Sequence, residues 1–122
     1  MACLRCVKDI PDVVIDEQTG QAKYVQIRIQ DPSGQCKVIV RSSKCAELHN
    51  DIFEPIYVQL RQLGWECECL GGGRIFRDIE KKNMCVYGYS VAFGMADHKR
   101  TVDILSKKYP PPTTIQWSND GY

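Results

Sequence analysis

The chain has 122 residues and a formal net charge of +1, because 16 Lys and Arg nearly balance 15 Asp and Glu. This length suits a single compact domain, and the balanced charge supplies no overall positive field to attract a polyanion such as duplex DNA. The sequence has no apolar run near the roughly 20 residues that span a bilayer, and its start lacks the apolar stretch of a secretory signal. We therefore expect a cytoplasmic protein that binds neither nucleic acid nor membrane.

The sequence contains seven cysteines, an odd number that argues against a disulfide framework of the secreted kind. Cys3 and Cys6 have the CxxC spacing of a zinc or redox pair, but no second such pair follows. Tetrahedral zinc needs four ligands, so we predict reduced thiols and no metal site.

The first residues of the chain give the weakest structural signal. Residues 1–12 show no clear period, and residues 16–20 are typical of a turn. We accordingly divide the chain into a partly flexible N-terminal segment, 1–21, and a single domain, 22–122.

A β-hairpin is predicted at the start of this domain. Apolar and polar residues alternate over 23–29, which is the pattern of a half-buried strand. A turn at 31–34 leads to a β-branched run over 36–41. Lys23 stands at the entrance of the first strand and Arg41 closes the second.

A long helix is predicted next, with Ser43 as its N-cap and Gly64 after its end. Apolar residues recur at steps of three and four along it. Pro55 lies inside this pattern and is expected to kink or split the helix, because proline removes a backbone donor and crowds the preceding turn. His49 lies in the first half, beside the apolar stripe, so we expect its imidazole to face the edge of the sheet.

The next three predicted strands form a meander. Residues 65–70 alternate and lead into Gly71–Gly73, where we expect a tight hairpin or a bulge. Residues 74–79 are the expected return strand, and 84–90 are rich in strand-forming residues.

A second helix is predicted over 97–109, closed by three prolines, and a last short strand over 113–117. This order of elements predicts an α+β domain with a mixed sheet of about six strands covered by two helices.

Three of the cations stand at predicted strand ends, namely Lys23, Arg41 and Arg74, and His49 follows Arg41 closely. If these side chains converge, fixed positive charges surround one neutral imidazole, which is the arrangement that a phosphoryl-transfer site needs. The simpler interpretation is that long cationic side chains solvate strand ends and that the histidine is structural.

Several motifs carry a family resemblance: C-E-C-L-G-G-G-R-I at 67–75, V-Y-G-Y-S at 86–90, A-F-G at 92–94 and the terminal W-S-N-D-G-Y at 117–122. They closely resemble the 14 kDa phosphohistidine phosphatases, the family that also contains the janus and ocnus proteins of flies. The likeness covers about Ala22 to Tyr122, whereas residues 1–12 match no pattern that we can name.

The resemblance implies a cofactor-independent protein phosphatase that hydrolyses the phosphoramidate bond of phosphohistidine and, in some members, phospholysine. Its partners would be phosphohistidine-containing proteins, and a monomer is the default. The histidine that matches His49 is catalytic in this family. The matching substrate-binding residues are Lys23, Ser90, Val91, Ala92, Arg41 and Arg74. We expect the backbone amides of Ser90 to Ala92 to form an anion-binding nest.

Several alternatives stay open at this point. His49 either deprotonates an attacking water or attacks phosphorus itself. The chain is otherwise a non-catalytic phosphate-recognition module of the janus type. An RNA-binding module would stack bases on Tyr87, Tyr89 and Phe93, but it needs a basic face that the composition does not suggest. For His98, which also matches a family position, a capping or surface role is favoured over catalysis.

Overall fold

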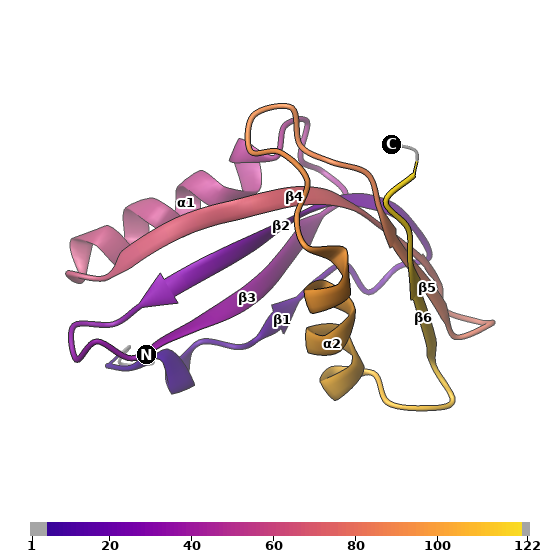
Figure 1. The fold of residues 1–122 in the computed structure, drawn as a ribbon, viewed down its shortest axis with the longest axis horizontal. Helices are drawn as coiled ribbons and strands as arrows, with labels where there is room; N and C mark the ends of the chain where they lie inside the picture. Colours follow the sequence, from indigo (N-terminus) through magenta and orange to yellow (C-terminus); the bar gives the residue numbers. More distant parts are fainter. Residues whose placement is uncertain (1–4, 121–122) are drawn as a thin grey trace.

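The computed structural model describes residues 5–120 and contains a curled six-stranded sheet with two helices (Figure 1). The strands lie side by side in the order β1-β3-β2-β4-β5-β6. They are β1 (Val13–Val14), β2 (Gly20–Gln30), β3 (Cys36–Ser43), β4 (Glu66–Asp78), β5 (Asn83–Tyr87) and β6 (Thr114–Trp117). The helices are α1 (Asn50–Gln62), α2 (His98–Lys108) and a 3-10 turn, Val7–Asp9.

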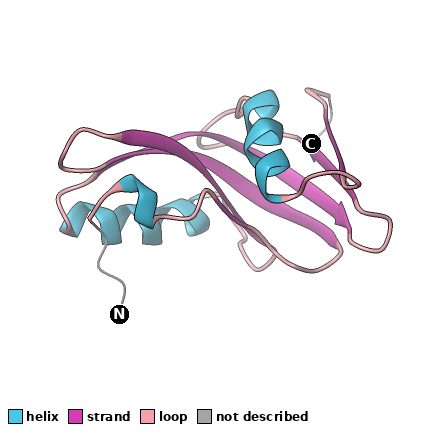
Figure 2. Cartoon of the chain, turned by 90° about the horizontal axis from the view of Figure 1, so that it is seen from below, coloured by secondary structure: helices cyan, strands magenta, loops and turns pink. Residues whose placement is uncertain are grey.

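The sheet is mixed because β1 runs parallel to β3 and β6 parallel to β5, while the central pairs are antiparallel. Figure 2 shows the two helices on opposite sides of the sheet. The predicted α+β class, with about six strands covered by two helices, is therefore confirmed.

The two faces of β2 carry separate cores, because successive side chains of a strand point in opposite directions. Tyr24 is buried with Leu105 of α2, whereas Val25 is buried with Ile52 of α1. All three apolar residues and the tyrosine ring are excluded from water almost completely, which stabilises the sheet on both sides. The predicted hairpin between β2 and β3 is confirmed by the register from Lys23 to Gln30.

Side chains before Ala22 also enter these cores. Val7 is buried with the α1 core, and Val13 with the α2 core. The backbone N–H of Val40 in β3 donates to the carbonyl of Asp12 at 2.9 Å. The sheet thus contains residues from both predicted parts of the chain, 1–21 and 22–122.

The predicted CxxC pair lies partly outside the described residues, because Cys3 is among those not described.

The triple glycine does not form a hairpin, so the expected return strand is wrong and the bulge is right. β4 is continuous and pairs with β2 along its length, with a register shift between Gln26 and Ile27 that leaves Leu70 as the extra residue. Gly71 beside the bulge has φ +148, and a Cβ there would lie 2.7 Å from the backbone N of Ala96. The glycine therefore permits both the bulge and the close approach of a loop.

The predicted start of the long helix is also wrong. α1 begins at Asn50, and Leu48, which the helical pattern places on the apolar face, is 64% exposed. The carboxylate of Asp51 accepts the N–H of Leu48 at 2.9 Å, so the chain enters the helix through a capped turn. The helix continues through Pro55 and is not split there. A single lost backbone hydrogen bond is tolerated because Ile52 and Leu60 bury the inner face.

The last elements lie close to their predicted positions. The side chain of Asp97 accepts the N–H of Arg100 at 3.2 Å and caps α2, which begins at His98, one residue after the predicted start. β6 pairs with β5 as the final strand. The strand predicted over 84–90 is shorter, however, because β5 ends at Tyr87 and Gly88 turns the chain with φ +77.

Candidate functional site

His49 stands at the N-cap position of α1, where the chain reaches the sheet above β4. Its side chain is buried, and its Nε2 lies 2.9 Å from the carbonyl oxygen of Gly73. The ring sits over Gly72, whose missing side chain leaves room for it: a Cβ there would lie 2.7 Å from Cδ2 of His49.

This hydrogen bond decides which ring nitrogen of His49 is basic. A carbonyl oxygen accepts and never donates, so Nε2 carries the hydrogen. In the neutral ring, the lone pair then lies on Nδ1, and no hydrogen bond to Nδ1 occurs among residues 5–120. Nδ1 is the atom that can take a proton or attack an electrophile.

Two cations lie on the same face of the sheet as His49. Lys23 of β2 and Arg74 of β4 are directly opposite each other in the antiparallel register. Burial lowers the pKa of His49 most, the positive charges of Lys23 and Arg74 lower it further, and the bond to Gly73 partly offsets them. The imidazole is therefore neutral at neutral pH.

The loop between β5 and α2 closes the other side of this site. Ser90 is 1% exposed, its N–H donates to the carbonyl of Gly94 at 3.0 Å, and its hydroxyl accepts the N–H of Phe93 at 3.0 Å. Within the described part of the chain, the N–H groups of Val91 and Ala92 donate no hydrogen bond. Of the three predicted binding amides, these two are the ones left available to an anion.

The same loop is fastened to the sheet and to α1. The N–H of Gly72 donates to the carbonyl of Gly94, and the carbonyl of Gly72 accepts the N–H of Ala96, each at 3.0 Å. The ring of Phe93 meets that of Phe53 in α1 edge to face, with centroids 5.5 Å apart. Ser90, Val91 and Ala92 thus belong to a loop whose backbone is hydrogen-bonded to Gly72, the glycine that the ring of His49 covers.

Arg41 makes its contacts elsewhere. Its guanidinium donates to the carbonyl of Val40 at 2.9 Å and to that of Pro11 at 2.7 Å. Burial lowers its pKa to about 10, against the raising effect of the Asp12 charge. The structure therefore brings together Lys23, His49 and Arg74, whereas Arg41 holds the segment that precedes β1.

Sequence comparisons place these residues in a family. A sequence model described as the Janus/Ocnus family (Ocnus) matches residues 7–113. The chain belongs to the Janus/Ocnus family. The predicted resemblance is thereby confirmed, and the match begins at Val7, ahead of the expected start at Ala22.

Relatives in the Janus/Ocnus family carry two kinds of name. The chain is 40% identical over its full length to the full-length 14 kDa phosphohistidine phosphatase of Sus scrofa. It is 43% identical to the protein of the same name from Homo sapiens, over 93% of this chain and 94% of the relative. It is 45% identical to the sex-regulated protein janus-A of Drosophila melanogaster, over 84% of this chain and 76% of the relative.

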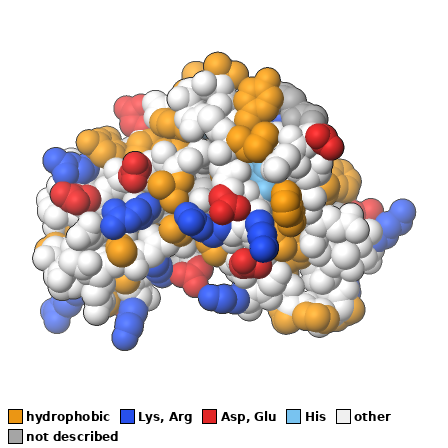
Figure 3. Space-filling view, viewed as in Figure 1, with side chains coloured by type: hydrophobic (Ala, Val, Ile, Leu, Met, Phe, Trp, Pro, Cys, Tyr) orange, Lys and Arg blue, Asp and Glu red, His pale blue; other side chains and the backbone are white. Residues whose placement is uncertain are grey.

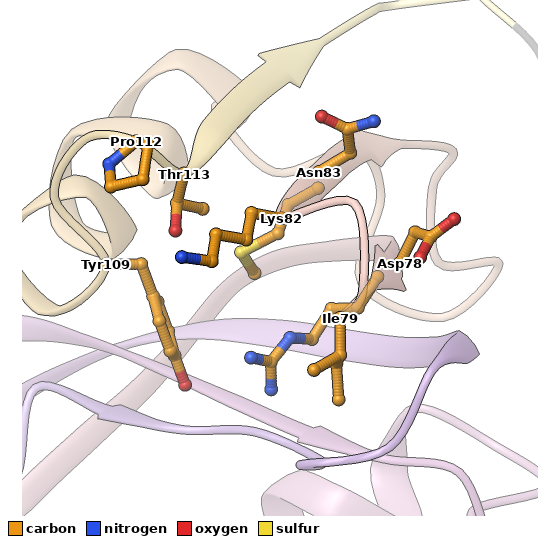
Figure 4. A pocket seen from close by; sticks show the side chains of 9 residues that line it. Asp78, Ile79, Lys82, Asn83, Tyr109, Pro112 and Thr113 are labelled. Atoms are coloured by element: carbon orange, nitrogen blue, oxygen red, sulfur yellow. The ribbon is translucent and has the colours of Figure 1, made fainter.

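A separate hollow of about 220 Å³ lies away from these residues, between the β4–β5 turn and the segment before β6 (Figure 4). Lys82 and Tyr109 reach into it, and none of the predicted site residues lines it.

In residues 5–120, no three His, Cys, Asp or Glu side chains are grouped so as to hold a metal ion. None of the helices in the same range is long and apolar enough to cross a membrane.

The face of this Janus/Ocnus protein in Figure 3 mixes basic and acidic side chains over the same area instead of gathering one sign of charge.

Sequence reasoning missed the role of Gly72 and Gly73, because three glycines in a row are a weak signal for any particular site. Their function becomes visible only when the rings that approach them are known.

Proposed function

We propose that this chain is a protein phosphatase that hydrolyses the phosphoramidate bond of phosphohistidine in proteins. The observation that carries the proposal is the neutral imidazole of His49, with its basic Nδ1 on the same sheet face as Lys23 and Arg74. The names of the mammalian relatives support the choice of substrate.

In this proposal the phosphoryl oxygens bind the ammonium of Lys23, the guanidinium of Arg74 and the N–H groups of Val91 and Ala92. Fixed donors of this kind stabilise the charge that develops on a phosphoryl group without reorganising during the reaction. Ser90 contributes by holding the loop, since its own N–H and hydroxyl are engaged within it. No step requires a metal ion or another cofactor.

The chemical step uses Nδ1 of His49. As a general base, Nδ1 takes a proton from water, the water oxygen bonds to phosphorus, and the P–N bond breaks. The bonding electron pair stays with the substrate imidazole, which takes up a proton, so the products are inorganic phosphate and histidine. General base assistance of this kind contributes about 10² to 10⁴-fold. Alternatively, Nδ1 attacks phosphorus, the substrate P–N bond breaks, and the substrate histidine leaves with its bonding electron pair and takes up a proton. Water then attacks the phosphohistidine formed on the protein, which releases inorganic phosphate and restores His49.

One assay tests the activity itself. Purified protein is incubated with a phosphohistidine peptide and with para-nitrophenyl phosphate, with and without EDTA, and the spontaneous hydrolysis of the labile P–N bond is subtracted. We expect preference for the phosphoramidate and no effect of the chelator. His49→Ala should abolish turnover while binding of inorganic phosphate persists, and a fully active His49→Ala protein would refute the assignment.

A rapid quench with labelled substrate separates the two chemical routes. A labelled protein intermediate that forms and decays at the rate of turnover supports attack by His49, whereas its absence in a resolved burst supports attack by water.

We further propose that the protein acts as a monomer in the cytoplasm, on phosphohistidine-containing proteins. Size-exclusion chromatography and cell fractionation test those two points.

A second function, recognition of phosphorylated proteins without turnover, is favoured by the janus-A relatives, whose names describe no enzyme. The same cations and amides would then bind the phosphoryl group and leave it intact. The two functions differ in one measurement, because only the phosphatase releases inorganic phosphate from the bound peptide.

A further inference from the structure

A buried polar cluster lies on the face of β4 opposite to His49. Tyr24 and Gln26 of β2 and His98 and Thr101 of α2 are each at most 1% exposed. Burying polar groups in this way is unfavourable unless hydrogen bonds replace the lost water. The cluster therefore needs an explanation that packing alone does not give.

The bonds of His98 have fixed directions. Its Nε2 lies 2.8 Å from the carbonyl of Gly88, so Nε2 donates. Its Nδ1, at 2.6 Å from the hydroxyl of Tyr24, then accepts from that hydroxyl in the neutral ring. A Cβ on Gly73 would lie 2.7 Å from Cε1 of His98, so this ring also depends on a glycine for its place.

The hydrogen-bonded network continues from Tyr24 to Thr101 and Gln26. Thr101 Oγ1 donates to the hydroxyl of Tyr24 at 3.1 Å. Gln26 Nε2 donates to Thr101 Oγ1 at 2.9 Å and to the carbonyl of Asp97 at 3.0 Å. One continuous network thus links the carbonyl of Asp97 to the carbonyl of Gly88, and donation runs outward from Gln26 Nε2 toward both of these acceptors.

These two carbonyls mark the ends of the loop between β5 and α2. The strand ends just before Gly88, and Asp97 is the N-cap of α2. Between them, Gly94 and Ala96 bond to the backbone of Gly72, on which the ring of His49 rests. The cluster therefore holds the two ends of this loop from the face of β4 opposite to His49, while the middle of the loop is hydrogen-bonded to the glycine that the ring of His49 covers.

We propose that His98 is a positioning residue: together with Tyr24 it fixes both ends of this loop and so aims Ser90 to Ala92 at the site of His49. The catalytic consequence rests on the proposed phosphohistidine phosphatase function, whereas the fixing of the loop does not. His98 itself touches no reacting atom, because β4 lies between its ring and that of His49.

The test removes one oxygen atom. Tyr24→Phe leaves Nδ1 of His98 without its donor, and Tyr109→Phe is the matched control, since its hydroxyl bonds Glu17 at a distant edge. Hydrogen exchange is followed at the amides of Ser90 and Gly94, with Ile39 in β3 as the internal reference. We expect protection at the two loop amides to fall in Tyr24→Phe and to stay unchanged at Ile39 and in the control.

Turnover is measured on the same proteins. A misplacement of about 1 Å can cost about 10²-fold in rate, so we expect kcat/KM for a phosphohistidine peptide to fall between about 10 and 100-fold in Tyr24→Phe. His98→Gln keeps a donor and an acceptor in its amide, whereas His98→Phe fills similar space without either. Both variants are assayed below their melting temperatures, so that both are folded. A positioning role then predicts more activity in the Gln variant than in the Phe variant, whereas a role limited to filling volume predicts the reverse.

The outcomes separate cleanly. Unchanged exchange at Ser90 and Gly94 in Tyr24→Phe overturns the proposal, even if turnover falls. Faster exchange with unaltered turnover overturns the claim that the loop is aimed at the site. If the wild-type protein hydrolyses no phosphohistidine, the proposed function fails by itself, and the exchange data still decide whether His98 fixes the loop.

Discussion

His49 and His98 lie against opposite faces of one strand, each over a glycine of the same triplet. A Cβ on Gly72 would meet His49 at 2.7 Å, and a Cβ on Gly73 would meet His98 at the same distance. Both rings donate through Nε2 to a backbone carbonyl, and both have a pKa lowered mainly by burial. They differ in Nδ1, which meets a tyrosine hydroxyl in His98 and has no hydrogen bond from residues 5–120 in His49.

Gly72→Ala should displace the ring of His49. The added methyl group would also lie 2.8 Å from the carbonyl oxygen of Tyr24, so the strand must shift as well. We expect kcat/KM for a phosphohistidine peptide to fall by about 10²-fold, together with a loss of about 1 to 3 kcal/mol in the free energy of unfolding.

Gly64→Ala provides the control for lost stability. Gly64 has φ +83 and open space around its Cβ position, so alanine there is strained but touches nothing. It should cost about 1 kcal/mol and leave turnover unchanged. Equal turnover in Gly72→Ala and wild type, measured below both melting temperatures, would contradict the placement of His49.

The rate should depend on pH through His49. Because the base must be neutral, kcat/KM should fall in acid as the ring takes up a proton, at a pH below the ordinary value of 6.5 for histidine. Lys23→Met removes one of the charges that lower this pKa, so the acid limb of the kcat/KM profile should move to higher pH. The profile is measured with subtraction of spontaneous hydrolysis.

Lys81→Met serves as the control because Lys81 lies exposed in the turn after β4. It removes the same charge without approaching the site and should leave the acid limb in place. An acid limb that moves to lower pH in Lys23→Met, or that does not move, would show that the titrating group is not His49. A proton NMR titration of the His49 ring gives the same comparison without substrate.

The parts of this fold that the sequence predicts are those governed by local pattern. Alternation over 23–29 predicts β2, and the apolar pattern over 97–109 closed by three prolines predicts α2, because both signals are local along the chain. Lys23 and Arg74 do lie opposite each other, but neither stands at a strand end as predicted, because Lys23 lies inside β2 and Arg74 inside the continuous β4.

The parts that the sequence does not predict depend on partners far along the chain. β1 has only Val13 and Val14, too few residues for a period, and exists through its pairing with β3. Gly71 suggests a reversal of the chain, but pairing with β2 along the whole strand leaves a bulge instead. Leu48 fits a helical pattern, yet a capping bond from its N–H to Asp51 delays the helix.

Arg41 and Arg74 should respond differently to truncation. The Arg41 guanidinium holds the carbonyls of Val40 and Pro11, so Arg41→Ala should lower the free energy of unfolding by about 2 kcal/mol and leave phosphate affinity nearly unchanged. Arg74→Ala should weaken phosphate binding at least about tenfold, because it removes a cation next to Lys23. Denaturant titration and calorimetric binding of phosphate measure the two effects, and a loss of phosphate affinity in Arg41→Ala would place that residue in the binding site.

Acid should destabilise the protein in two separate ranges of pH. The pKa values of His49 and His98 are lowered from 6.5 by burial, so below pH 6.5 the unfolded chain binds more protons than the folded one. The stabilisation is complete above 6.5 and is lost as pH falls through the folded pKa values. The carboxyl pKa of Asp31 is likewise lowered, from 3.8, by its hydrogen bond with Ser33, so its contribution is lost only in stronger acid.

Urea unfolding, followed by the fluorescence of the buried Trp65, measures this dependence. In His98→Gln the slope of the free energy of unfolding against pH should be smaller just below pH 6.5, because one of the two titrating rings is gone. The slope in stronger acid should be unchanged, since Asp31 is still present. Parallel curves for the variant and the wild type would mean that His98 takes up its proton equally well in the folded and unfolded chains, against the burial that holds it neutral.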